Sequence, residues 1–413
     1  MLTGCEEFIN WLENPVSPNL KMSVSPKTMK VGETYTRAAQ TYKGAVVSYS
    51  SSDETVATVD ENGTVSALAE GSTTITASVI DGKAEYTQIS YIKESLSYEV
   101  TVVPAIDPML ATPLTMEATT AGTIVIKTPK VNMKYKKNND DLVTISSNDD
   151  VTITVAIGDK VAFYGDGTTI TSYNGTKISG GSAQVKVYGN VMSLVDETGF
   201  ADAKTLTTNS AFSNLFLGNS QLANASGLQL PATTLTASCY ANMFNGCTSL
   251  TTAPKLPATE LKDDCYNSMF WGCLSLTTAP KLPATELKLR CYNFMFNSCS
   301  SLTTAPELPA TTLATGCYWY MFCGCTNLTT APKLPATTLA PTCYRFMFYG
   351  CTSLTKAYVK AAYTNTNNEC DNMFTGCTDA ATSTFYGDDA ANWKTAFAAE
   401  LGSWATAAYP TAP

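Results

Sequence analysis

Apolar and polar residues alternate in short runs over residues 21–104, and turn signals separate the runs. Alternation with a period of two predicts strands that bury one face. The apolar positions on either side of the turn Asp60-Glu-Asn-Gly63 are expected to face inward: Val56, Val59, Val65, Ile75 and Ala77. About seven short strands over this stretch predict a β-sandwich of two sheets.

A second β-rich region is predicted over residues 105–200. Pro104, Pro108 and Pro113 mark a linker at its start, since proline suits neither a helix interior nor a central strand. Glycine and asparagine turns then separate four further strand patterns: Thr123–Lys127, Val151–Ala156, Lys160–Tyr164 and Gln184–Tyr188. We expect a second sandwich-like domain that is placed to cap the region after it.

A 26-residue period dominates the rest of the chain. Leu230-Pro-Ala-Thr-Thr-Leu235 returns with its first leucine at positions 256, 282, 308 and 334, and Cys-Tyr-x-x-Met-Phe-x-x-Cys recurs inside each repeat. Residues that are identical at a fixed period stack in successive coils, which predicts a solenoid with a parallel sheet over residues 201–380. The spacing of the Cys-Tyr-x-x-Met-Phe segment predicts short helices. Trp393, Phe397, Leu401 and Trp404 then predict a capping helix in residues 381–413.

Thirteen of the fourteen cysteines fall between residues 239 and 377, and most of them form two columns of the repeat. A ladder of buried thiols explains them best, because cysteine packs as a small apolar side chain. Disulfides between coils and a metal site are the alternatives. The Cys-x-Cys at Cys323 and Cys325 lacks the partner pair or histidine that a metal site needs, so we expect no metal.

Only positions that vary inside the conserved repeat can give each coil its own specificity. Aromatic residues and one arginine accumulate at such positions toward the C-terminal coils: Trp271, Phe294, Trp319, Tyr320, Arg345, Phe346 and Tyr349. Aromatic rings beside an arginine suit a protein partner or sugar rings. The alternative is that these rings fill gaps between neighbouring turns.

Composition excludes several functions. The chain has no histidine, and therefore no Ser-His-Asp triad or Cys-His dyad. A net charge of −9 with three arginines argues against nucleic acid as a partner. Glu260, Glu286 and Glu307 have no paired carboxylate column that would face them across a cleft. We therefore expect a non-enzymatic protein without catalytic residues or cofactors.

Three parts of the chain resemble known families. Lys30-Val-Gly-Glu33, Val56-Ala-Thr-Val-Asp60 and Asn62-Gly-Thr-Val65 resemble the group 2 bacterial Ig-like domain, although Tyr49 stands where that family usually has tryptophan. Phe244-Asn-Gly-Cys-Thr-Ser-Leu250 and its copies resemble the BspA-like class of leucine-rich repeat. Leu2-Thr-Gly-Cys5 resembles a bacterial lipobox, and Glu6-Glu7 is similar to the export signal of Bacteroidetes-type surface lipoproteins.

These resemblances imply a multi-domain surface lipoprotein. The expected parts are a lipoprotein tail and linker (1–20), an Ig-like domain (21–104), a β-rich middle domain (105–200), a leucine-rich-repeat solenoid (201–380) and a C-terminal capping helix and tail (381–413). Lipidation of Cys5 would anchor the protein in the outer membrane, and this anchor would be its only membrane contact. The resemblance implies adhesion to host or bacterial surface proteins. A glycan-binding accessory role in nutrient capture and a structural role in a surface layer or appendage are the alternatives.

Overall fold

The computed structural model describes residues 15–84, 89–103, 108–130, 132–166, 175–378 and 381–410. The chain folds as two compact units, Met1–Asp107 and Pro108–Pro413. Both consist mainly of β-sheet and contain few helices, which confirms the predicted fold class at this level. Cys5 and its flanking residues lie outside the described residues. No helix in the described part of the chain is long and apolar enough to cross a membrane.

The described residues of the first unit form seven strands in two sheets. They are β1 (Lys27–Lys30), β2 (Thr34–Thr36), β3 (Ala45–Ser51), β4 (Ala57–Val59), β5 (Thr64–Ala67), β6 (Gly71–Gly82) and β7 (Ser95–Val103). One sheet has the order β1-β7-β6-β3 and the other β2-β5-β4. This arrangement agrees with the number of strands that the alternating pattern predicts.

The predicted inward-facing residues of this unit are buried. Val56, Val65 and Ile75 belong to its core, Ala77 is buried, and Val59 is half-buried against the core. The turn after Val59 is held by the Asp60 carboxylate, which accepts hydrogen bonds from the backbone N–H of Asn62 (2.9 Å) and Thr64 (2.7 Å). The bond from Thr64 lowers the pKa of Asp60 most.

The second unit begins with two sheets. Their strands are β8 (Thr115–Ala118), β9 (Gly122–Lys127), β10 (Lys134–Lys137), β11 (Val143–Thr144), β12 (Val151–Val155), β13 (Lys160–Tyr164), β14 (Lys177–Ile178), β15 (Val185–Asn190) and β16 (Leu222–Gln229). The sheet orders are β11-β10-β13-β8-β15-β16 and β12-β9-β14. A 3-10 helix, η1 (Val191–Leu194), follows β15.

This β-rich region and the repeats share one hydrophobic core. β15 pairs in parallel with β16, and β16 in turn contacts the first full repeat through the bridge between Asn224 and Thr252. A single cluster of buried residues runs from Leu114 to Trp404. The strand before the repeats therefore covers the first coil, as a cap must in a repeat protein.

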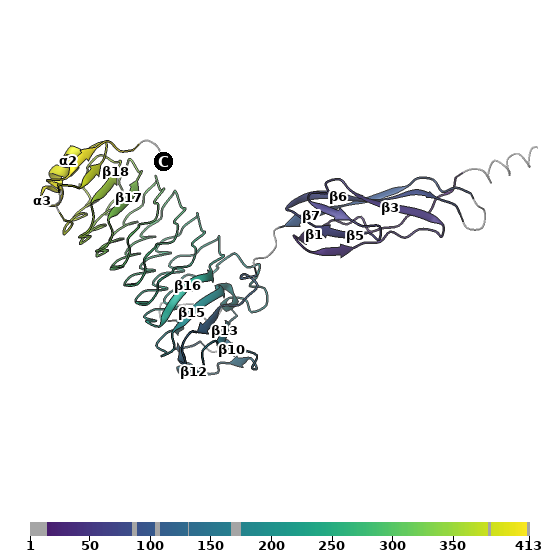
Figure 1. Ribbon diagram of the computed structural model, residues 1–413, viewed down its shortest axis with the longest axis horizontal. Helices are drawn as coiled ribbons and strands as arrows, with labels where there is room; N and C mark the ends of the chain where they lie inside the picture. Colours follow the sequence, from purple (N-terminus) through teal and green to yellow (C-terminus); the bar gives the residue numbers. More distant parts are fainter. Residues whose placement is uncertain are drawn as a thin grey trace, which may run out of the picture. The chain divides into compact units, whose positions relative to one another are not determined.

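The repeats lie on one another as successive coils, which we call the coil stack (residues 205–378; Figure 1). Parallel bridges join Thr252 to Thr278 and Thr278 to Thr304. Later coils form a regular parallel sheet: β17 (Thr330–Leu334), β18 (Lys356–Val359), β19 (Thr384–Tyr386) and β20 (Ala405–Ala407). The threonine pairs thus lie on or beside the extended segments, as their β-propensity predicts.

The prediction of short helices in the repeats is wrong, because no residue between 205 and 378 is helical. Each Cys-Tyr-x-x-Met-Phe segment instead forms consecutive four-residue turns, with Ser238, Asn242 and Gly246 all at positive φ in the first full repeat. The N–H groups of alternate residues bond to the next coil, as from Asn242 to the carbonyl oxygen of Asn267 (2.9 Å). An α-helix would instead have used every N–H internally.

Stacked side chains fill the coils. The tyrosine column at residues 240, 266, 292, 318 and 344 has ring centroids 5.6–6.2 Å apart. The phenylalanine column at residues 244, 270, 296, 322, 348 and 374 has centroids 5.4–5.8 Å apart. The thirteen cysteines of the described residues are free thiols, and all are buried except Cys323, which is half-buried.

The predicted C-terminal helix is shorter than expected. It consists of α2 (Ala390–Ala396) and α3 (Ala398–Leu401), which are separated at Phe397, where the backbone leaves the helical region. Residues 405–407 form β20 and extend the sheet instead of continuing the helix. Trp393 and Trp404 are nonetheless buried at the end of the coil stack, so both tryptophans cover the last coil.

Candidate binding surfaces

The seven residues predicted to bind a partner lie together on the coil stack, and we call this group the aromatic stripe (Trp271, Phe294, Trp319, Tyr320, Arg345, Phe346 and Tyr349). Its centre is a column in which the Phe294 and Tyr320 rings are 4.6 Å apart and the Tyr320 and Phe346 rings 4.5 Å apart. Trp271 stacks on Phe294 at 5.3 Å, and Tyr349 contacts Phe346 at 5.6 Å. Residues from four repeats therefore form one continuous surface.

The backbone places the three central rings. Phe294, Tyr320 and Phe346 have φ values of 55°, 56° and 53°, in the left-handed region. The same position is Asn242 or Ser268 in the preceding coils, and asparagine tolerates this conformation far better than a large aromatic residue does. The stacked rings therefore occupy a turn position at a conformational cost, and strain of this kind tends to gather at functional sites.

Exposure separates the two ends of the stripe from its centre. Trp271 and Tyr349 are exposed by 40% and 41%, whereas Phe294, Tyr320 and Phe346 are half-buried. Because the central rings lie face to face at about 5 Å, each covers part of its neighbour. The centre thus matches the packing alternative, and Trp271 and Tyr349 are the rings that a partner could reach.

Arg345 and Trp319 lie beside the central column. The Arg345 guanidinium lies 5.3 Å from the Phe346 ring and 5.9 Å from the Trp319 ring, both within cation–π range. Its Nε is 3.7 Å from a carboxylate oxygen of Asp371. Partial burial raises the pKa of Tyr320. The stripe has an apolar surface with one cation, and whether it binds a partner stays a prediction.

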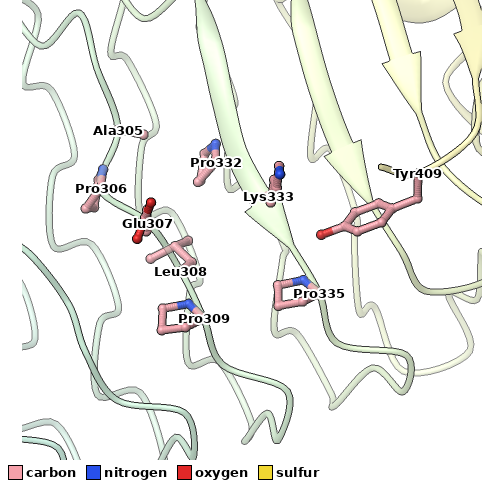
Figure 2. Close-up of a pocket in the computed structure, with 9 residues that line it drawn as sticks. All are labelled: Ala305, Pro306, Glu307, Leu308, Pro309, Pro332, Lys333, Pro335 and Tyr409. Carbon is pink, nitrogen blue, oxygen red and sulfur yellow. The ribbon is translucent and has the colours of Figure 1, made fainter. Parts of the chain in front are cut away.

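A concave surface lies on the extended side of the third to fifth repeats, and the sequence patterns did not predict it. This proline groove has a volume of about 400 Å³ and is lined by Ala305, Pro306, Glu307, Leu308, Pro309, Pro332, Lys333, Pro335 and Tyr409 (Figure 2). Tyr409 follows β20 and reaches the groove from the end of the chain. Burial, with the Asp388 carboxylate adding to it, raises the pKa of Tyr409.

The proline columns of the groove are visible in the sequence, but the contribution of Tyr409 is not. Pro306 and Pro309 recur one repeat later as Pro332 and Pro335, so the same furrow is built into neighbouring coils. Tyr409 joins them only because the chain comes back toward β17 after β20, the strand that lies farthest from β17 in that sheet. That return is a contact between distant segments, which no periodicity encodes.

The first unit matches a known family. The model of the bacterial Ig-like domain (group 2) matches residues 20–89. This stretch is a bacterial Ig-like domain. The match confirms the resemblance seen in the motifs around Val56 and Asn62, and it leaves the repeats outside the matched residues.

No curated protein matches this chain. A solved structure with partial similarity is SGBP-B of the Bacteroides ovatus mixed-linkage glucan utilization locus, in complex with a mixed-linkage heptasaccharide. The two sequences are 10% identical, and the alignment covers 33% of this chain and 47% of that one, with a TM-score of 0.12. This chain therefore spans about half the length of that structure.

Proposed function

We propose that this chain is a non-enzymatic binding protein of the bacterial cell surface. In this proposal the Ig-like domain is a spacer, and the coil stack is a leucine-rich-repeat solenoid of the BspA-like class that presents the aromatic stripe to a protein partner. Cys5 carries the lipid that anchors the protein in the outer membrane. The Ig-like domain supports a surface location, because such modules serve as spacers and adhesion units in the family that it resembles.

The observation that carries the proposal is the convergence of the variable residues. The aromatic residues at the variable positions of the repeat form one continuous surface, with Trp271 and Tyr349 exposed at its ends. Exposed aromatic residues around a preformed, packed centre are typical of protein-binding hot spots. A partner would bury these two rings without reorganising the rigid column between them, which lowers the entropic cost of binding.

A protein partner fits the stripe better than a glycan does. Sugar rings stack on the open faces of aromatic side chains, and in the central column those faces are occupied by neighbouring rings. The accessible ring edges and the Arg345 guanidinium suit an apolar protein surface with an acidic group.

Surface plasmon resonance against a set of purified extracellular-matrix proteins tests this proposal. The Trp271→Ser, Tyr349→Ser double variant removes both exposed rings, and Ile157→Ser is the matched control, because Ile157 is exposed by 72% and lies outside the stripe. We expect at least a tenfold loss of affinity in the double variant, which corresponds to about 1.4 kcal/mol, and unchanged affinity in the control. If no matrix protein binds, or if the double variant binds as well as the control, the proposal is wrong.

A further inference from the structure

We draw no further inference here: the strongest candidate, the proline groove on the extended side of the third to fifth repeats, carries none, because nothing in the structure shows what covers its apolar walls.

Discussion

The Sγ of Cys299 donates a hydrogen bond of 3.1 Å to the carbonyl oxygen of Phe270 in the preceding coil. The same bond recurs from Cys247, Cys273, Cys325, Cys351 and Cys377 to the equivalent carbonyl oxygens of residues 216, 244, 296, 322 and 348. This cysteine column therefore links each coil to the one before it. Its thiols are donors as well as small apolar side chains, a combination that alanine does not offer.

Removing one of these donors should destabilise the coil stack. Cys299→Ala leaves the buried carbonyl oxygen of Phe270 without this bond and opens a small cavity, so we expect a loss of about 1–3 kcal/mol in the free energy of unfolding. Urea denaturation measures this loss. Cys323→Ala is the control, because Cys323 is half-buried and stands outside the column, and its effect should stay within about 0.5 kcal/mol. Equal effects of the two variants would contradict the role of the column.

Thiol labelling should distinguish Cys323 from the ladder. Burial raises the pKa of Cys291 and Cys299 to about 12, and burial also raises the pKa of Cys323, although that side chain is partly accessible. Only the thiolate reacts quickly with alkylating agents. Among the thirteen described cysteines, Cys323 should therefore be alkylated first in the folded protein at pH 8. Mass spectrometry of the unreduced, alkylated protein checks this.

The same experiment tests the free thiols themselves. In denaturant without reductant, all fourteen cysteines should become alkylated, unless Cys5 carries a lipid. Recovery of disulfide-linked peptides from the repeats would contradict the thiol ladder, and so would rapid labelling of Cys299 in the folded chain.

Stability should fall in alkali. The ordinary pKa of a thiol is near 9, and burial raises that of Cys239, Cys291 and Cys299 to about 12. Below pH 8 these thiols are protonated in both the folded and the unfolded chain, so their ionisation does not reduce the free energy of unfolding. Above pH 9 the unfolded chain releases protons that the folded chain retains, so unfolding becomes more favourable up to about pH 12. The slope is about 1.4 kcal/mol per pH unit for each such thiol.

Urea denaturation at pH 8 and pH 10 measures this dependence. The urea concentration at the midpoint of unfolding should be clearly lower at pH 10 than at pH 8. The decrease should be smaller in Cys299→Ala than in the parent chain, because this variant lacks one of the titrating groups. A midpoint that is the same at both pH values would show that the thiols do not titrate on unfolding.

The repeat made the coil stack predictable, but not the conformation of its turns. Identical residues at a fixed period must stack, and for that reason the Phe270 and Cys299 columns and the convergence of the aromatic stripe follow from the sequence. Helices and consecutive four-residue turns both place apolar residues four positions apart, so the spacing alone did not decide between them. Gly246 and its copies Gly272, Gly324 and Gly350 were a partial signal, because glycine favours positive φ, but the equivalents of Asn242 in the later coils are aromatic and gave no such signal.

Tyr320 offers a test of the strain in the aromatic stripe. It has a φ of 56° and lies between the rings of Phe294 and Phe346. Tyr320→Ala and Tyr320→Asn both remove the ring, and they differ in their tolerance of the left-handed conformation. Alanine carries a cost of about 1–2 kcal/mol there, whereas asparagine is accommodated, as Asn242 is in the first full repeat.

We therefore expect Tyr320→Ala to be the less stable variant, by about 1 kcal/mol, in urea denaturation of the full chain. Both should be less stable than the parent chain, because the loss of two stacked ring contacts outweighs the strain that is relieved. A Tyr320→Asn variant that is more stable than the parent would show that the backbone strain at this position exceeds the stabilisation from the stacked ring. The aromatic column would then be kept at the expense of stability, which would strengthen its assignment as a binding surface. Equal stability of the two variants would show that the backbone relaxes out of the left-handed region when the ring is removed.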